Sequence, residues 1–592
     1  MNKLRSWSVL WIILVAAALT LTACPAASPA PSGEQAAPAE EAAPAEEAAP
    51  AEEAAPAQEM KQIVYALYQE PEILNPYIAT QTAAGEVNSM VVEGLLGVDP
   101  DGNFYPALAT EVPSVENGMV SEDGMTVTYN LREGVVWSDG EPFTCDDVVF
   151  TWEAITNPES GAVSTTGYDK IESVTCDGDY KVTVQYSEFY APYLTLFGAI
   201  MPRHATGDPA DMQNWDYNWD GLLGTGPFVL TEWVSGDHIT LVKNEKYRGY
   251  PDLPKADQII VRIIPSREVG KALITSGEID ILWDLTEADV PEFEANPDVT
   301  VNKRPSPGTE RLLLNLADPT LDATDDPINN PHPLLGDVRV RNAIELGIDK
   351  QFIVDELLFG ATTVGTSELN IGWPKCDIPA SPYDPEGAKA LLEEAGFTDE
   401  DGDGVRECHG CANAEEGTPL RLKLQTTTGN QLREEAEQLL IEMMSEIGVE
   451  FYIENVPSSE LFGSWASGAF RKHGNFDILM YTTSGGVDPQ SHMYGYFHKD
   501  SMPTEANGGR GFNYSRWVND RASEALDRAG SVPDLAERKA AYQVVCEEIA
   551  KDDPHIYLYD RSDVHLSRSN IVGFDVNPWD NQTWNAEMWD KQ

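Results

Sequence analysis

The sequence predicts a mixed α/β protein with two interwoven lobes that are joined by a hinge. From Lys61 onward, segments with the two-residue period of strands alternate with segments that have the 3.6-residue period of helices. No second low-complexity linker divides the roughly 530 residues that follow. Lobes folded from separate blocks of chain would be joined by such a linker. We therefore expect the chain to cross between the two lobes more than once.

The first 23 residues have the pattern of a secretory signal peptide. Lys3 and Arg5 precede an apolar run that ends in small residues and a cysteine. The last three residues of this segment and the cysteine that follows, Leu21-Thr22-Ala23-Cys24, are similar to the lipobox of bacterial lipoproteins, so we expect Cys24 to carry a lipid. An ordinary signal peptide cut near Ala23 is the alternative. No other stretch approaches the ~20 apolar residues that a membrane-spanning helix needs.

Residues 24–59 are predicted to form a disordered tether rich in alanine, proline and glutamate. From Ala36 to Glu59 the hexad A-A-P-A-E-E occurs four times, with Gln58 as the one deviation. Proline at every sixth residue interrupts helices, and the like charges repel one another. This segment would hold the folded part of the protein near a membrane.

Several elements of residues 60–592 can be placed from their patterns. Residues 126–131 and 181–186 alternate apolar and polar side chains, as half-buried strands do. Thr144 and Asp147 have the spacing of a capping box, so a helix is expected over the residues that follow, to Ile155. Asp384-Pro385 begins another helix, which Gly396 ends. Apolar stripes over 432–447 and 535–549 predict two more helices.

Charge and motif content narrow the functional class. The formal net charge is −59, and the first 59 residues hold only two basic and eight acidic side chains, so most of the excess lies on the folded part. Such an excess repels phosphate backbones, and we expect no nucleic-acid partner. The sequence has no H-E-x-x-H, G-x-S-x-G or P-loop motif. It therefore predicts a binding protein rather than an enzyme.

Six cysteines follow Cys24, and outside the cytoplasm they are expected to form disulfides. Cys145 and Cys176 flank one passage from a helix to a strand and are the first predicted pair. Cys376 is expected to bond Cys408 or Cys411, although spacing alone does not determine the connectivity. Zinc bound by these last three thiolates is the alternative.

Six blocks of the chain resemble the family 5 bacterial extracellular solute-binding proteins, the oligopeptide- and dipeptide-binding receptors of ABC importers. They follow the order of that family and extend over nearly all of residues 61–592. The blocks are "LREGVVWSDGEPFTCDDVVFTWEAI" (131–155), "GTGPFVLTEWVSGDHITLVKNEKYRG" (224–249), "ALITSGEIDI" (272–281), "VRVRNAIELGIDKQFIVDELLFG" (338–360), "YDPEGAKALLEEAGF" (383–397) and "ERKAAYQVVCEEIAKDDPHIYLYDR" (537–561). A series of long blocks in order is far more specific than any single motif.

The resemblance implies the large type of periplasmic-binding-protein fold, with an extra subdomain. The first lobe would comprise about 60–92, 217–312 and 565–592, the subdomain about 93–216, and the second lobe about 313–564. The protein would be a monomer outside the cytoplasm, anchored by its lipid in a periplasm or on the outer face of the cell. It would close on a solute and deliver it to a membrane permease, near which the tether keeps it concentrated.

Peptide-binding relatives hold an extended ligand in the cleft between the lobes, paired with strand edges. Two segments here match those that line the cleft, "YQEPEILNPY" (68–77) and "YTTSGGVDPQ" (481–490). The expected ligand contacts are Tyr68, Gln69, Glu70, Tyr481, Thr482, Thr483, Ser484, Gly485, Gly486 and Asp488. Four aromatic residues, Trp283, Trp373, Trp465 and Tyr559, are candidates for stacking on a sugar. Ordinary packing is the alternative for all of these side chains.

One departure from the family bears on the ligand. Peptide-binding relatives carry an aspartate shortly before the Asp/Glu-Pro pair, and its carboxylate holds the α-ammonium of the peptide. Counted back from Asp488-Pro489, that position is Gly485 or Gly486. A buried ammonium without a partner is costly. Either Asp488 or Glu70 replaces the missing carboxylate, or the ligand is an oligosaccharide, a nickel complex, an opine or another solute.

The segment "DEDGDGVRECHGC" (399–411) resembles a calcium-binding loop. Asp399, Asp401 and Asp403 occupy its first, third and fifth positions, and Glu407 its ninth. The twelfth position, where calcium loops have a bidentate glutamate, is Gly410, and Glu415 or Glu416 would have to replace it. A solvated turn without metal is the alternative. His473, His492 and His498 are expected to be packing or surface residues rather than nickel ligands.

Overall fold

The computed structural model describes residues 60–79, 81–463, 465 and 468–592. The predicted signal peptide, Cys24 and the predicted tether lie outside the described residues. Among the helices of the described part, none combines the length and the apolar character needed to cross a membrane.

One mixed sheet of ten strands runs through the described residues. Its strands lie side by side in the order β15 (Glu450–Ile453), β14 (Arg421–Gln425), β16 (Ile478–Ser484), β11 (Val299–Leu314), β17 (His555–Arg568), β10 (Ile281–Leu285), β1 (Gln62–Leu67), β9 (Gln258–Ile263), β8 (His238–Lys243) and β7 (Phe228–Val234). β14 to β16 belong to the second lobe, whereas β1 and β7 to β10 belong to the first.

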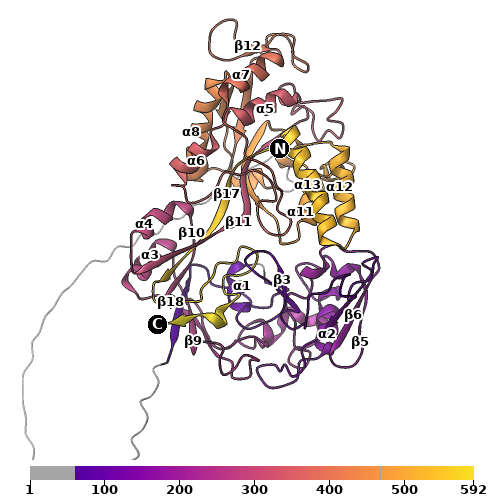
Figure 1. The fold of residues 1–592 in the computed structure, drawn as a ribbon, viewed down its shortest axis with the longest axis vertical. Coiled ribbons are helices and arrows are strands. Elements are labelled where there is room, and N and C mark those ends of the chain that lie inside the picture. Colours follow the sequence, from indigo (N-terminus) through magenta and orange to yellow (C-terminus); the bar gives the residue numbers. More distant parts are fainter. Residues whose placement is uncertain (1–59, 80, 464, 466–467) are drawn as a thin grey trace, which may run out of the picture. The chain divides into compact units, whose positions relative to one another are not determined.

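The two longest strands, β11 and β17, pair antiparallel and pass from one lobe into the other (Figure 1). Their register shifts between Pro305 and Thr309, and again between Glu310 and Arg311. Such shifts bend and twist a strand pair locally. We call residues 305–310 of β11 and 559–562 of β17 the hinge. Because both strands cross here, far apart in the sequence, the lobes are interwoven, as the sequence predicts.

The first lobe and a small three-stranded sheet share one hydrophobic core, which includes Tyr65 of β1 and Val127 of the small sheet. The remaining elements of this half are β2 (Leu96–Val98), β3 (Phe104–Pro106), β4 (Thr126–Asn130), β5 (Ile171–Cys176), β6 (Lys181–Tyr186), β18 (Ile571–Val572), β19 (Asp590–Lys591), α1 (Thr82–Asn88), α2 (Cys145–Thr156), α3 (Arg267–Ser276) and α4 (Val290–Glu294). The predicted subdomain thus shares one continuous core with β1.

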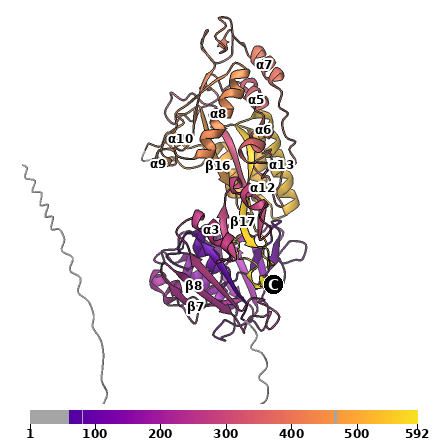
Figure 2. The same ribbon diagram turned by 90° about the vertical axis from the view of Figure 1, so that its left-hand side faces the viewer.

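In the second lobe, helices cover both faces of the sheet (Figures 1 and 2). One face packs against α5 (Val338–Leu346), α6 (Lys350–Leu357), α7 (Pro385–Glu394) and α8 (Gln431–Glu446), and the other against α9 (Ser458–Leu461), α10 (Phe470–His473), α11 (Gln490–Phe497), α12 (Asp520–Ser531) and α13 (Leu535–Asp552). A short hairpin of β12 (Phe397–Thr398) and β13 (Glu407–Cys408) follows α7. The predicted lobe boundaries near 313 and 564 fall within β11 and β17 and stay predictions.

The elements placed from sequence patterns are confirmed. The strands predicted at 126–131 and 181–186 are β4 and β6, and they pair with each other. α2 begins with the predicted capping box, in which the Asp147 carboxylate accepts a bond from the Thr144 amide (3.0 Å). Asp384 caps α7 by accepting from the Gly387 amide (2.9 Å). The two apolar stripes form α8 and α13.

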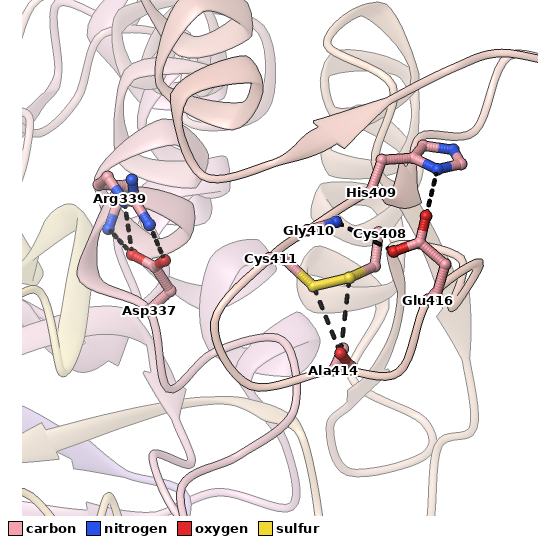
Figure 3. The surroundings of a disulfide bond; sticks show 8 residues. All are labelled: Asp337, Arg339, Cys408, His409, Gly410, Cys411, Ala414 and Glu416. Atoms are coloured by element: carbon pink, nitrogen blue, oxygen red, sulfur yellow. Dashed lines mark hydrogen bonds and ion pairs between the residues drawn. A yellow bond between two sulfur atoms is a disulfide. The ribbon is translucent and has the colours of Figure 1, made fainter.

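The described residues contain three disulfides, and one predicted pairing is wrong. Cys145 bonds Cys176, as predicted. Cys376 bonds Cys546 of α13 instead of Cys408 or Cys411, which bond each other across three residues (Figure 3). The error arose because Cys376 and Cys546 are 170 residues apart, and only the packing of α13 against the segment before α7 brings them together. Because Cys376, Cys408 and Cys411 are all in disulfides, their sulfur atoms cannot bind zinc as thiolates, and the zinc alternative is excluded for the oxidised protein.

Candidate functional site

At the hinge, strands β11 and β17 carry buried charged side chains, and β16 pairs with β11 beside them. Glu310 pairs across the sheet with Thr482 on one side and Tyr559 on the other, whereas Arg311 pairs with Tyr481 and Tyr557. Because successive residues of a strand point to opposite faces, Glu310 and Arg311 serve two different networks. Both side chains are nearly inaccessible to solvent.

The Glu310 network holds Thr482. The Arg433 guanidinium on α8 binds both oxygens of Glu310 (2.9 and 3.1 Å), and the Thr482 hydroxyl donates to Glu310 Oε2 (2.5 Å). Such a bidentate pair has a defined geometry as well as a favourable charge interaction. The predicted contact residue Thr482 is therefore oriented by the hinge.

The Arg311 network lies on the opposite face. Arg311 forms an ion pair with Glu368, and the Glu368 carboxylate also accepts a bond from the Thr483 hydroxyl (3.2 Å) and contacts His492 Nε2 (2.5 Å). Burial alone would raise the pKa of Glu368, but the Arg311 charge and the His492 bond outweigh it, so that its pKa lies well below the usual value. Burial lowers the pKa of the adjacent His555 to about 4, which leaves that ring neutral.

The first-lobe side of the hinge is acidic. Arg561 binds both oxygens of Glu287 (2.8 and 3.1 Å). Burial, reinforced by the charges of Asp284 and Glu287, raises the pKa of Asp563 to about 7. Burial likewise raises the pKa of Asp560 to about 6, although hydroxyl and amide donors partly oppose the effect. This side of the hinge consequently favours cations over anions.

The three predicted contacts of the first lobe follow β1 directly. Tyr68 stacks on Trp283 (ring centroids 5.0 Å apart), and its hydroxyl bonds Asp284 and accepts from Arg267 (2.9 Å). Gln69 is exposed in the bend. Glu70 borders an open pocket of about 660 Å³, shared with Trp219 and Trp233. This group thus presents a carboxylate beside aromatic rings.

Glu70 is held as an anion. Its Oε1 accepts from the Trp233 indole (3.2 Å) and from the Gly236 amide (3.0 Å). Burial would raise its pKa, but these donors outweigh burial and lower it. The Ser235 side chain is a third donor that lowers this pKa, and the carboxylate borders the open pocket.

The second-lobe segment 481–486 has a strand on one side only. β16 pairs with β11 as far as Ser484, whereas β14 pairs with it only at Ile478 and Leu479. The Thr426 hydroxyl donates to the Met480 carbonyl (2.7 Å), and beyond this bond no described strand pairs with the outer side. Gly485 and Gly486 have ordinary backbone angles, and a Cβ on Gly486 would meet only one backbone oxygen, at 3.9 Å.

Asp488 lies within an ion pair of the second lobe. Its two oxygens bind Nη1 and Nη2 of Arg538 on α13 (2.6 and 2.7 Å), and both side chains are buried. Trp373 packs over this guanidinium (5.4 Å to the ring centroid) and donates its indole N–H to the Val487 carbonyl (2.7 Å). Because Arg538 already occupies the Asp488 carboxylate, Asp488 is a poor replacement for the missing ammonium partner.

The other predicted aromatic contacts pack within the protein. Tyr559 is fully buried within the hinge, where burial raises its pKa well above the usual value. Trp465 stacks on His473, with centroids 4.0 Å apart. No hydrogen bond or ion pair between described residues joins the Tyr68–Glu70 group to segment 481–488. Each group stays a predicted contact surface of its own lobe.

The sequence did not reveal the ionic residues in and around the hinge, namely Glu287, Glu310, Arg311, Glu368, Arg433 and Arg561. One signal was present, because Glu310 and Arg311 directly precede the apolar residues of "TERLLLN", which predict a buried strand. Buried charges require partners. Their partners lie between 57 and 274 residues away, which no local pattern reveals.

The predicted calcium loop brings its acidic side chains together. One carboxylate oxygen from each of Asp399, Asp401, Asp403 and Glu407 lies within 4.8 Å of the others. Among the described residues this is the one group of potential metal ligands. Glu416, a candidate for the twelfth position, instead bonds the His409 ring (3.0 Å) and the Gly410 amide (3.1 Å) beside the Cys408–Cys411 disulfide (Figure 3). The calcium site stays a prediction.

Three comparisons with known proteins agree with this fold. A family model described as "Bacterial extracellular solute-binding proteins, family 5 Middle" matches residues 103–504. The chain is 26% identical over 530 residues to the oligopeptide-binding protein AppA of Bacillus subtilis (strain 168), covering 88% of this chain and 90% of that protein. It is 26% identical over 431 residues to the nickel-binding periplasmic protein of Escherichia coli (strain K12), covering 71% and 75%. The solved structure of Bacillus subtilis AppA with a nonapeptide matches with a TM-score of 0.61 at 23% identity, covering 90% and 99%.

Proposed function

Because the chain belongs to family 5 of the bacterial extracellular solute-binding proteins, we propose that it captures peptides outside the cytoplasm and delivers them to the permease of an ABC importer. Its relatives are binding proteins rather than enzymes. The peptide assignment is the finer part of the proposal, since one relative is named for oligopeptides and another for nickel.

The outer side of β16 is the observation that carries the peptide assignment. Beyond Met480 the strand lacks a partner on this side among the described residues, and it adjoins the hinge. An extended peptide would add a strand here through backbone hydrogen bonds, largely independently of its side chains. The hinge networks of Glu310 and Glu368 would keep the edge straight by fixing Thr482 and Thr483.

The charges favour a peptide whose N-terminus reaches the first lobe. Arg538 occupies Asp488, and Gly485 and Gly486 supply no carboxylate, so segment 481–488 has no acid to spare for an ammonium group. Glu70 is held as an anion at the border of an open pocket, and Asp563 adds an acidic group next to the hinge. The ligand's ammonium would therefore lie beside Glu70 or the hinge, on the side opposite to its place in peptide-binding relatives.

The sequence of the N-terminal segment supports a location outside the cytoplasm. A lipid on Cys24 and a tether over 24–59 would hold the receptor at the outer face of the membrane, within reach of its permease. The protein would act there as a monomer.

Native mass spectrometry of the freshly purified protein tests the ligand. We expect a co-purified mass that tandem fragmentation resolves into amino-acid residues, and we expect the same peptides to be recovered unchanged after incubation. Fragments spaced by hexose units would replace the peptide assignment with oligosaccharide, and a metal isotope pattern would replace it with a metal complex. Cleaved peptides would contradict the receptor function itself.

A further inference from the structure

A cavity of about 430 Å³ lies in the second lobe, beside the edge of β17. Its walls are the start of β17, the second half of α13, the junction of α5 and α6, and segment 366–382. The Cys376–Cys546 disulfide fastens that segment to α13. None of the residues expected to contact the transported solute lines this cavity. It is therefore a separate space, of the size of small-ligand sites in proteins.

The inner end of the cavity carries an ion pair with one oxygen unused. Lys350 Nζ binds Glu345 Oε1 at 2.5 Å, and both residues are more than nine-tenths buried. The second oxygen of Glu345, Oε2, is buried and has no hydrogen-bond partner among the described residues. A buried carboxylate oxygen without a donor is costly unless a ligand supplies one.

Asp553 is the second acidic group at this end. It follows α13 in the left-handed conformation (φ 44°), is 7% exposed and forms no ion pair with any described residue. The amide of Asn342, in the orientation that satisfies both of its polar atoms, donates to Asp553 Oδ2 at 3.0 Å. Of the remaining acids that line the wall, Glu368 is already neutralised by Arg311, and Glu547 is exposed at the mouth.

We propose that this cavity is a second ligand site, which takes a small organic ammonium ion between Glu345 and Asp553. A primary ammonium has three N–H donors and one positive charge, which match the unused Glu345 oxygen and the unpaired Asp553 carboxyl. The walls formed by Ile378, Pro379 and Ile549 suit an alkyl chain. Two carboxylates are too few for a calcium ion, which takes six to eight oxygen ligands.

Binding should depend on pH through Asp553. Burial and the charge of Glu345 raise the pKa of Asp553 to about 8, with a smaller contribution from Asp552, whereas Lys350 and Arg341 lower it. The carboxyl is therefore mostly protonated at pH 7 and must lose its proton to pair with an ammonium. As pH rises toward 8, the affinity for the ammonium ion should increase, by about tenfold per pH unit well below pH 8. Above pH 8 the affinity should level off. The neutral His555 ring does not add to this dependence.

Isothermal titration calorimetry with 1,4-diaminobutane tests the proposal on the intact protein, with 1,4-butanediol as the uncharged probe. We expect the diamine to bind at pH 8, to weaken at least fivefold at pH 7, and the diol not to bind. Asp553→Asn should weaken binding at least tenfold and remove the pH dependence. This variant should fold, because asparagine tolerates the left-handed conformation and replaces a carboxyl that is mostly uncharged. Ser381→Trp at the mouth should block entry without changing any charge.

Glu386→Gln is the matched control, since this exposed acid on α7 pairs with the half-buried Lys389, does not line the cavity and should leave the affinity unchanged. Absence of heat with the diamine at pH 8 and millimolar concentration would overturn the proposal. Equal binding of the diol and the diamine would also overturn it. Diamine binding that both Asp553→Asn and Ser381→Trp leave intact would overturn it too, because the amine would then bind elsewhere, for example beside Glu70. None of these outcomes bears on whether the protein captures peptides.

Discussion

Arg311 lies in the middle of the second lobe's sheet with no exposed surface, and Glu368 is its one partner of opposite charge among the described residues. Such a pair contributes little net stability relative to apolar residues of the same size, yet it makes the loss of either partner expensive. The same carboxylate fixes Thr483 and His492. This pair therefore couples the stability of the lobe to the position of its predicted ligand-binding strand.

We predict that Arg311→Met lowers the free energy of unfolding by about 3–5 kcal/mol, because it removes the one guanidinium that pairs with the buried Glu368 carboxylate. Adding Glu368→Gln should recover part of this loss, giving a double-mutant cycle with a clear interaction energy. Urea unfolding followed by tryptophan fluorescence measures both. Lys389→Met, which breaks the pair between the half-buried Lys389 and the exposed Glu386, is the control and should change stability by no more than about 1 kcal/mol. If Arg311→Met and Lys389→Met changed the free energy of unfolding by equal amounts, the buried pair would be no more important than the surface pair, and the prediction would be wrong.

His565 gives a prediction about pH. Its ring is buried, and Nδ1 accepts a bond from the Asp284 amide (3.0 Å), so the folded protein requires the neutral ring. Burial, only partly opposed by Asp284, lowers the pKa of His565 to about 4. Since the folded pKa lies below the unfolded value of about 6.5, the unfolded chain binds the proton first, and stability is lost as pH falls from about 6.5 to 4.

The size of this effect is at most about 3 kcal/mol, from the difference between the two pKa values. His565→Asn keeps an acceptor but does not titrate. We expect the wild type to lose more stability than this variant between pH 6.5 and pH 4, as measured by urea unfolding at each pH. Parallel curves for the two proteins would show that His565 does not titrate in this range.

Among single residues, the sequence revealed those with local partners. Thr144 and Asp147 were recognisable because a capping box spans only three residues. Glu310 and Arg311 were not recognised, because their partners approach only when α8 and the segment before α7 pack against the sheet. The predicted cleft residues 481–484 are split between the two faces of β16, a consequence of strand geometry that a list of residues does not convey.

At the scale of elements, the two second-lobe disulfides differ greatly in the length of chain that they close. Cys376–Cys546 spans 170 residues, whereas Cys408–Cys411 spans three. In the chain-entropy model the longer loop constrains the unfolded state more. We expect the double replacement of Cys376 and Cys546 by serine to cost about 2–5 kcal/mol, and that of Cys408 and Cys411 to cost less. Urea unfolding under non-reducing conditions compares them, and equal losses would contradict the prediction.

The acidic loop between β12 and β13 gives a prediction about metal. Asp399, Asp401, Asp403 and Glu407 converge at the hairpin, but the loop lacks a bidentate glutamate, because Glu416 is used beside the disulfide. We therefore expect weak calcium binding, in the 10⁻⁴–10⁻³ M range of extracellular modules. Differential scanning fluorimetry should show a rise in Tm with millimolar calcium, absent in Asp399→Asn. No rise in the wild type would mean that the loop is a turn without metal.

Helices and strands of strong periodicity were predicted well, and long-range pairings were not. The capping signals at Thr144 and Asp384 are local, so α2 and α7 begin where the sequence indicates. The partner of Cys376 depends on the packing of α13, which is encoded by apolar stripes more than 150 residues away. Spacing between cysteines contains no information about that packing.

For the whole molecule, β11 and β17 are the two strands that connect one lobe to the other. Their register shifts lie within the hinge, and Arg538 of α13 reaches the Ala191 carbonyl of the first half (3.1 Å) as a contact between the two. A solute that bonds both lobes favours the closed arrangement by its difference in affinity for the two states.

We predict that the radius of gyration, measured by small-angle X-ray scattering, decreases when the ligand-free protein is loaded with the peptide found by mass spectrometry. Native mass spectrometry first verifies that the sample carries no ligand. The scattering of this sample is then compared before and after the peptide is added. A second solute that does not bind is the control and should leave the curve unchanged. Identical scattering of empty and loaded protein would mean that the hinge does not close on its ligand.

The order of the cysteines along the chain has a consequence for biogenesis. Cys408 and Cys411 lie between the two members of the Cys376–Cys546 bridge, so the bridges are nested. A polypeptide that emerges from a translocation channel with its N-terminus first exposes Cys376, Cys408 and Cys411 well before Cys546. An oxidase that joined thiols in order of appearance would produce the wrong isomer. Correct maturation then requires either a thiol–disulfide reshuffling catalyst or a delay of oxidation until export is complete.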